Sequence, residues 1–173
     1  MRPSRKSILP VIASTITISF ILMTSCMKKE SFSIIPQIGF VSYYNVFDTG
    51  HIAKRGILTI SFQDGDGDIG LYSWDTSPPF DTGSIYYYNY YIDYYEKRNG
   101  IFVKDTLPIP FNTRIPYLTP DDPNKNIKGI IVDTLSLNPW PVYDTIQFSM
   151  YIYDRALHKS NVITTPQIVV RRP

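Results

Sequence analysis

The sequence predicts an all-β fold, a sandwich of two antiparallel sheets with about seven strands. Segments rich in Tyr, Ile, Val, Phe and Thr recur along the chain between Gly, Pro, Asn and Asp residues, which is the pattern of strands and turns. No window shows the three-to-four-residue apolar period of an amphipathic helix. The expected strands are 38–47, 56–63, 85–96, 101–107, 127–137, 145–154 and 162–170.

The first two expected strands follow a short polar segment. Strand 38–47 reads IGFVSYYNVF, and strand 56–63 reads GILTISFQ. In the second strand Leu58, Ile60 and Phe62 alternate with smaller or polar residues. Such alternation is typical of a strand with one buried face, so these three side chains are expected in the core.

The third and fourth expected strands form a hairpin. Asn99 and Gly100 stand between them, and this pair suits a two-residue turn with positive backbone angles. The tyrosine-rich third strand has two faces, one of which must be core. One face holds Tyr86, Tyr88, Tyr90, Ile92 and Tyr94, and the other holds Tyr87, Asn89, Tyr91, Asp93 and Tyr95.

The remaining strands complete the sandwich. The sixth has an apolar row of Ile146, Phe148, Met150 and Ile152, while Pro166 in the last strand favours an edge position. Residues 108–126 contain too many prolines for one regular strand. Hairpins and long crossings favour an immunoglobulin-like sandwich over a closed barrel, with one domain at 38–173.

A signal peptide is expected at residues 1–25. Arg2, Arg5 and Lys6 precede an uncharged, mostly apolar run from 8 to 23, which is shorter than the roughly 20 residues of a membrane span. These three are among the 17 basic residues of the chain, so the 15 acidic residues outnumber the remaining basic ones by one. No basic cluster remains to follow a phosphate backbone, and a nucleic-acid partner is not expected.

The only cysteine, Cys26, directly follows the signal segment. The stretch LMTSC resembles the lipobox of bacterial lipoproteins, although Met23 stands where leucine is usual and Leu22 lies one place further away. The resemblance implies that Cys26 is acylated, that 26–37 is a tether, and that the protein is held at the cell envelope, in the outer membrane. The alternative is a free or buried structural cysteine. Which side of the membrane the domain faces stays open.

The stretch QDGDGDIGL carries the candidate metal site. Asp64, Asp66 and Asp68 alternate with glycines that let the backbone turn tightly, as a calcium ion with its oxygen ligands requires. Ile69 stands where the helix-loop-helix calcium motif needs glycine, so that motif is not assigned. The alternative is a plain turn, since Gly and Asp favour turns without any ion.

Further ligands are expected from neighbouring loops. In a seven-strand sandwich the loops after strands two, four and six lie at the same end. They hold Asp121 and Asp122 after the fourth strand, and Asp154 and Asn161 after the sixth. Asp154 and Asn161 therefore join the three loop aspartates as candidate metal ligands.

Several segments resemble those of uncharacterised envelope lipoproteins of Bacteroidota with an immunoglobulin-like domain. These are ILTISFQDGDGDIGL, RIPYLTP followed by IKGIIV, and FSMYIYDRALHKSNVITTPQIVV. The resemblance covers most of the chain after about residue 55. It implies a β-sandwich at the envelope and brings no established activity.

The tyrosines suggest a second kind of site. Tyr87, Tyr91 and Tyr95 share a face with polar residues, where rings can stack on a glycan or on a protein, or only cover neighbouring strands. His51 and His158 are the only histidines and neither lies in a catalytic motif. The sequence therefore predicts a non-catalytic structural or protein-interaction module, with glycan binding as the alternative.

Overall fold

The computed structural model describes residues 31–47, 53–118, 125–137 and 142–170. Within these ranges the chain forms eight β-strands and no helix that could cross a membrane. The predicted acylation site Cys26 and the signal segment lie outside the described residues, as do His51, Asp121 and Asp122. The strands are β1 (Gln37–Phe47), β2 (Ala53–Asp64), β3 (Tyr90–Arg98), β4 (Ile101–Asp105), β5 (Ile127–Ser136), β6 (Thr145–Ile152), β7 (Ile163–Thr164) and β8 (Ile168–Val169).

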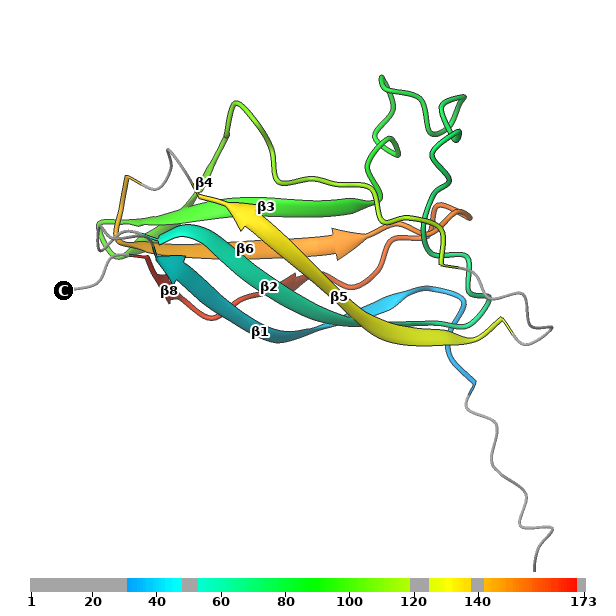
Figure 1. Ribbon diagram of the computed structural model, residues 1–173, viewed down its shortest axis with the longest axis horizontal. Helices are drawn as coiled ribbons and strands as arrows, with labels where there is room; N and C mark the ends of the chain where they lie inside the picture. Colours follow the sequence, from blue (N-terminus) through cyan, green and yellow to red (C-terminus); the bar gives the residue numbers. More distant parts are fainter. Residues whose placement is uncertain (1–30, 48–52, 119–124, 138–141, 171–173) are drawn as a thin grey trace, which may run out of the picture. The chain divides into compact units, whose positions relative to one another are not determined.

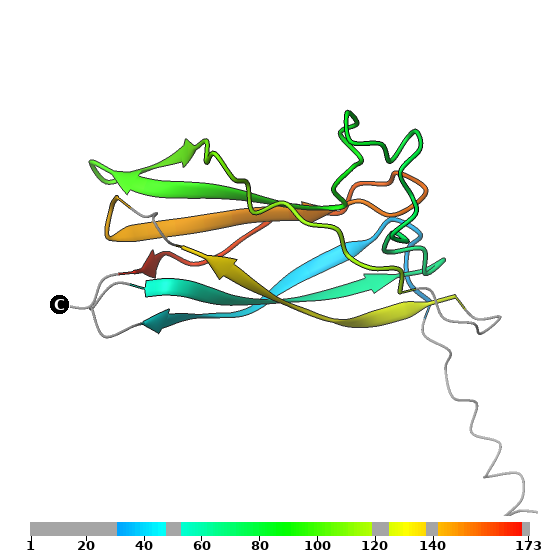
Figure 2. The ribbon, with the colours of Figure 1, turned by 45° about the horizontal axis from the view of Figure 1, so that its top comes forward.

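The strands form two antiparallel sheets that face each other, as Figure 2 shows. One sheet has the order β1-β2-β5, and the other has the order β4-β3-β6-β7 with β8 also paired to β6. Immunoglobulin domains of the constant type also place the first, second and fifth strands in one sheet and the third, sixth and seventh in the other, but their fourth strand joins the first sheet, whereas β4 pairs with β3. The predicted all-β antiparallel sandwich is confirmed.

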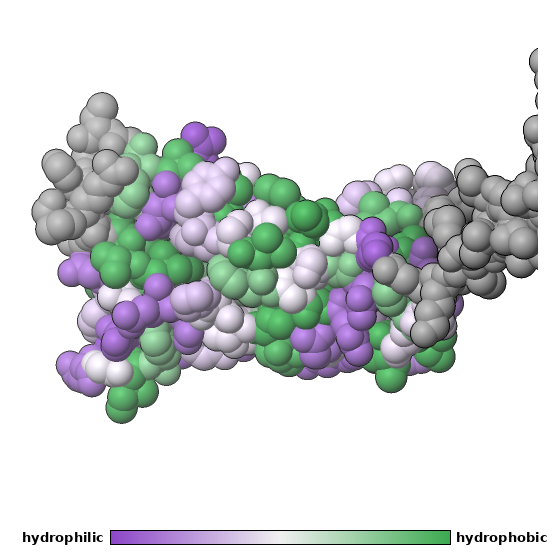
Figure 3. Space-filling model, turned by 90° about the horizontal axis from the view of Figure 1, so that it is seen from below, coloured by the Kyte–Doolittle hydropathy of each residue, from purple (hydrophilic) through white to green (hydrophobic). Residues whose placement is uncertain are grey.

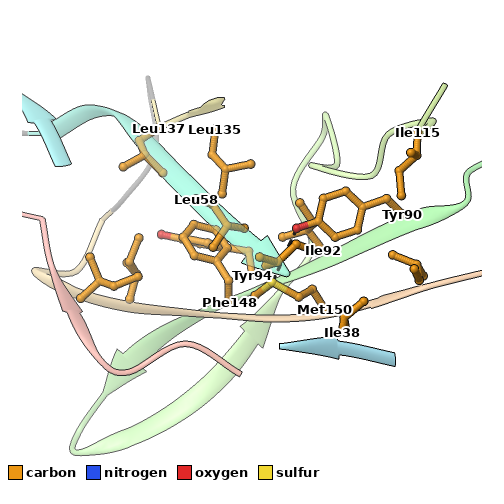
Figure 4. Packing of buried hydrophobic residues seen from close by; sticks show 14 of the residues in the cluster. Ile38, Leu58, Tyr90, Ile92, Tyr94, Ile115, Leu135, Leu137, Phe148 and Met150 are labelled. Atoms are coloured by element: carbon orange, nitrogen blue, oxygen red, sulfur yellow. Dashed lines mark hydrogen bonds between the residues drawn. The ribbon is translucent and has the colours of Figure 1, made fainter. Parts of the chain in front are cut away.

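The core lies between the sheets and is built by alternating residues of β2, β3 and β6 (Figure 4). Phe148 lies near its centre, with its ring centroid 5.8 Å from that of Tyr94 and 5.6 Å from that of Phe111. The Tyr90 hydroxyl lies 3.6 Å from the sulfur of Met150, so even this polar atom has a partner. Fully burying one large apolar side chain contributes about 1.5–3 kcal/mol.

The hairpin between β3 and β4 confirms the predicted Asn99–Gly100 turn. Asn99 has a φ of 51° and Gly100 a φ of 84°, the two consecutive positive angles of the favoured two-residue hairpin turn. Arg98 and Ile101 pair directly beside the turn. This short connection keeps β4 beside β3.

Two predicted strands differ from the structure in more than a shift of up to three residues at an end. The third begins at Tyr90 instead of residue 85, because a turn at Ser84 bends the chain and the Asn89 carboxamide bonds to the backbone of Ile115. The last expected strand is two short strands, β7 and β8, separated by the segment that holds Pro166. Both pair with β6 alone, which agrees with the expected edge position.

One end of the sandwich, here called the loop end, gathers the loops after β2, β4 and β6 (Figure 1). The strand register places it there, because Asp64 at the end of β2 pairs with Ile127 at the start of β5. In the second sheet Tyr90 at the start of β3 pairs with Ile152 at the end of β6. The predicted meeting of these loops is confirmed.

Candidate cation site at the loop end

The acidic loop brings three carboxylates together directly after β2. Asp64 is fully buried, Asp66 and Asp68 are partly exposed, and one oxygen of each lies within 4.8 Å of the others. Gly67 makes this possible, because its φ of 63° lies in the left-handed region and an added Cβ would lie 1.9 Å from the backbone oxygen of Lys125. The alternation of Asp and Gly therefore has a structural reason at this turn.

Three oxygen atoms in this cluster are buried without a partner. They are the Oδ1 atoms of Asp64, Asp66 and Asp68. By contrast, Oδ2 of Asp64 accepts a hydrogen bond from the backbone N–H of Asp68 at 3.1 Å. Buried polar atoms nearly always have partners, and unpaired charged ones are strongly unfavourable. Three such atoms on neighbouring carboxylates are an arrangement that a cation would satisfy.

The raised pKa values of the clustered carboxyl groups also favour a bound cation. Burial, together with the nearby charges of Asp66, Asp68 and Asp154, raises the pKa of Asp64 to about 7. Burial, together with the charges of Asp154 and Asp66, likewise raises the pKa of Asp68 to about 6. The site thus holds more negative charge than its surroundings compensate, and a divalent cation would relieve this repulsion.

Asp154, predicted from the loop after β6, does lie close enough to act on this cluster electrostatically. Its two oxygens are already used, however. Oδ1 accepts from the backbone N–H of His158 at 2.7 Å, and Oδ2 lies 2.9 Å from Nδ1 of the same histidine. Asp154 therefore adds charge to the site and holds its own turn in place.

Asn161, the fifth predicted ligand, is bonded to β1. Its Nδ2 donates to the backbone oxygen of Ile38 at 2.9 Å, and its Oδ1 accepts from the backbone N–H of Ile38 at 2.8 Å. Both ends of the carboxamide are engaged with one residue. In this arrangement Asn161 fixes the start of β1 beside the loop end and is not part of the carboxylate cluster.

An arginine that sequence reasoning did not select connects the cluster to the long loop after β2. The backbone N–H of Arg155 donates to the backbone oxygen of Asp68 at 3.2 Å. The Arg155 guanidinium pairs with the carboxylate of Asp75 and lies 5.3 Å from the ring centre of Tyr72. Arginine next to an aspartate is too common a dipeptide to have signalled this role.

The same arginine supports an aromatic stack. Tyr72 stacks on Tyr117 with ring centres 4.0 Å apart, and Trp74 stacks on Tyr72 at 4.6 Å with an interplanar angle of 8°. Arg155 also lies 5.7 Å from the ring centre of Tyr117. Trp74 nevertheless keeps 71% of its surface exposed. A large aromatic side chain is thus held firmly in an exposed position.

The predicted tyrosine face is only partly one surface. Tyr91 and Tyr95 point outward from β3, whereas Tyr87 precedes the strand and lies against the Arg114 guanidinium at 5.0 Å. Tyr91 stacks on Tyr151 with ring centres 5.1 Å apart. Lys159 places its ammonium 3.7 Å from the centre of the Tyr151 ring. The rings of Tyr91 and Tyr151 therefore cover each other.

Fold and cluster together define a β-sandwich domain with a candidate divalent-cation site. Comparison of the chain with protein-family models, with curated proteins and with solved structures finds no match. The resemblance to Bacteroidota envelope lipoproteins stays a prediction.

Proposed function

We propose that this protein is a lipid-anchored envelope protein whose β-sandwich is a non-catalytic structural or protein-interaction module, with calcium bound at its loop end. The observation that carries the calcium proposal is the set of three buried, unpartnered oxygens on Asp64, Asp66 and Asp68. The anchor proposal rests on the sequence LMTSC at Cys26.

Calcium is the cation that best fits this donor set. It takes six to eight oxygen ligands in flexible geometry, so three carboxylate oxygens with backbone and water oxygens suffice. Zinc prefers nitrogen and sulfur ligands, and the nearest histidine, His158, is engaged with Asp154. A site built on one short loop should bind weakly, with a Kd of about 0.1–1 mM, as extracellular modules do.

Bound calcium would stiffen the loop end. Asp68 already links two loops, because its backbone oxygen accepts from Arg155 and its Oδ2 accepts from the backbone N–H of Ala156 at 2.9 Å. Neutralising the repulsion among the carboxylates removes the force that opposes this link. A stiff loop end is a suitable surface for a partner.

Glycan binding through the tyrosine face has less support. A sugar ring stacks on an open aromatic face, but Tyr91 lies on Tyr151 and the ammonium of Lys159 lies over Tyr151. This mutual packing favours a stabilising role for the tyrosines on the outer face of the sheet.

The calcium proposal is tested by thermal unfolding of the mature chain during calcium titration. A ligand that binds only the folded state raises Tm once its concentration exceeds Kd. The wild type should gain stability at millimolar calcium, and the variant Asp64→Asn/Asp66→Asn/Asp68→Asn should not. Asp81→Asn, in the same loop but outside the cluster, is the matched control and should respond like the wild type. An equal response of all three proteins would rule out the site.

The anchor is tested separately with Cys26→Ser. The wild type should fractionate with membranes and carry the added mass of acyl chains, and Cys26→Ser should do neither. Several chains are needed for a stable anchor, because each buried methylene contributes about 0.8 kcal/mol. Membrane attachment of Cys26→Ser at the wild-type level would contradict lipid anchoring.

A further inference from the structure

We infer that the loop end is the membrane-facing end of the anchored domain, with the Trp74 side chain in the headgroup region of the bilayer. The inference rests on the lipid anchor proposed above and goes beyond it, because an anchor alone does not say which end of a domain meets the membrane.

The path of the chain into the sandwich is the first observation. The backbone oxygen of Ser33 accepts a hydrogen bond from the N–H of Gly65 at 2.8 Å, and the Phe32 N–H donates to Oδ1 of Asn126 at 3.2 Å. Gln37, the first residue of β1, pairs with Gln63 near the end of β2. The first described residues therefore lie at the loop end, beside the acidic loop.

The short chain between Cys26 and the sandwich limits how far the loop end can lie from the bilayer. Cys26 precedes Ser31 by five positions, which span at most about 18 Å when fully extended. The 12 residues of β2 extend about 40 Å from the loop end to the opposite end. An acylated Cys26 thus keeps the loop end close to the bilayer, while the opposite end is free to point away.

The exposed Trp74 is the second and independent observation. Tryptophan prefers the membrane interface, where its ring is partly buried among lipids and its N–H stays hydrated. Trp74 needs no rearrangement for this, because Tyr72, which is itself stacked on Tyr117, already holds its ring from one side. Ile34 and Ile35, also exposed, add apolar surface where the chain joins β1.

The flank of the sandwich also exposes apolar side chains, such as Ile130 and Val132 on β5, but the one tryptophan among the described residues lies at the loop end. On the side seen in Figure 3, hydrophobic and hydrophilic residues are interspersed along the flank. A bilayer contact is therefore better supported at the loop end than along this side.

The cation site affects the same contact. Uncompensated carboxylates at Asp64, Asp66 and Asp68 would repel anionic lipid headgroups, and bound calcium would remove that repulsion. Asp68 is joined to the Trp74 stack through Arg155, which pairs with Asp75. Bound calcium should therefore let the Trp74 ring lie deeper in the headgroup region of the bilayer.

The test uses the acylated full-length mature protein in vesicles of phosphatidylethanolamine and phosphatidylglycerol, with and without brominated lipids. The variant Trp140→Phe leaves Trp74 as the only tryptophan. The matched control, Trp74→Phe/Trp140→Phe/Ile101→Trp, places the only tryptophan at an exposed position beside the hairpin at the opposite end. Vesicle flotation first shows whether each protein is attached.

Brominated lipids should quench most of the Trp74 emission. Acrylamide should quench Trp74 of the vesicle-bound protein less than Trp74 of the unacylated chain in detergent-free solution. The control tryptophan should show neither effect. If the proteins float with vesicles but Trp74 stays fully accessible to acrylamide, the loop end faces a soluble partner and this inference is overturned. If the proteins do not float, the lipid anchor itself fails and the inference falls with it.

Discussion

Asp68 and Ala156 are 88 positions apart in the chain, and the Asp68 carboxylate accepts a hydrogen bond from the Ala156 backbone N–H at 2.9 Å. This bond joins the loop after β2 to the turn after β6. It uses Oδ2 and leaves Oδ1 of Asp68 buried without a partner. One carboxylate thus links two loops and also presents an oxygen to the candidate cation site.

Asp64→Asn should have opposite effects with and without calcium. In EDTA at pH 8 the variant should be at least as stable as the wild type, because Asn removes a buried charge whose pKa burial raises to about 7 and can still accept from the Asp68 N–H. In 5 mM calcium the wild type should gain about 1–2 kcal/mol by mass action at a Kd near 0.5 mM, and the variant little. Urea unfolding in the two buffers measures both effects. A variant destabilised equally in both buffers would show a purely structural role for Asp64.

The calcium-free domain should lose stability as pH rises from about 4 to about 7. Asp64 and Asp68 titrate near 3.8 in the unfolded chain, but burial raises their folded pKa to about 7 and about 6. The folded state then binds more protons than the unfolded state in this window, so raising the pH favours unfolding. The pH dependence of the urea midpoint in EDTA measures this.

The double variant Asp64→Asn/Asp68→Asn is the control for that titration. Its midpoint should fall less over the same pH range, and saturating calcium should flatten the wild-type profile in a similar way. Identical profiles for wild type and variant in EDTA would mean that other groups determine the pH dependence.

Local patterns predicted the parts of the fold that depend on neighbouring residues. The alternation of Leu58, Ile60 and Phe62 gave the buried face of β2, and Asn99–Gly100 gave the hairpin, because each needs only residues that are close in sequence. The clustering of Asp64, Asp66 and Asp68 followed from their shared turn.

Contacts between residues far apart in the chain could not be predicted from the sequence. The tyrosine-rich run becomes a strand only after Asn89, because the Asn89 side chain bonds to the backbone of Ile115, a residue 26 positions away. Asn161 was a reasonable ligand by residue type, but its partner Ile38 lies 123 positions away. Arg155 stacks on aromatic rings of two other loops. A single sequence carries no signal for such pairings.

Asn161→Ala should lower stability without changing calcium affinity. It removes both hydrogen bonds to the backbone of Ile38, and the loss should be about 1–2 kcal/mol because the site is only partly buried. Urea unfolding gives the loss of stability, and the calcium dependence of Tm gives the affinity. A weakened calcium response in this variant would restore Asn161 as a ligand.

Arg155→Lys should loosen the aromatic stack while keeping the charge next to Asp75. Lysine lacks the planar guanidinium that lies over the rings of Tyr72, Tyr117 and Phe80, so those stacking contacts are lost. We expect a loss of about 1–2 kcal/mol, because each cation–π contact contributes about 0.5–1 kcal/mol at exposed sites and the losses are not fully additive.

The Trp74 signal separates this role from general destabilisation. In a Trp140→Phe background, Arg155→Lys should shift the Trp74 emission to the red and increase its quenching by acrylamide under conditions where the domain is still folded. Lys104→Arg, on β4 and paired with Asp93, is a conservative control that should leave Trp74 unchanged. Unaltered Trp74 emission in Arg155→Lys would mean that Tyr72 and Tyr117 hold the tryptophan without the arginine. The acidic cluster and the exposed ring would then be independent features of the loop end.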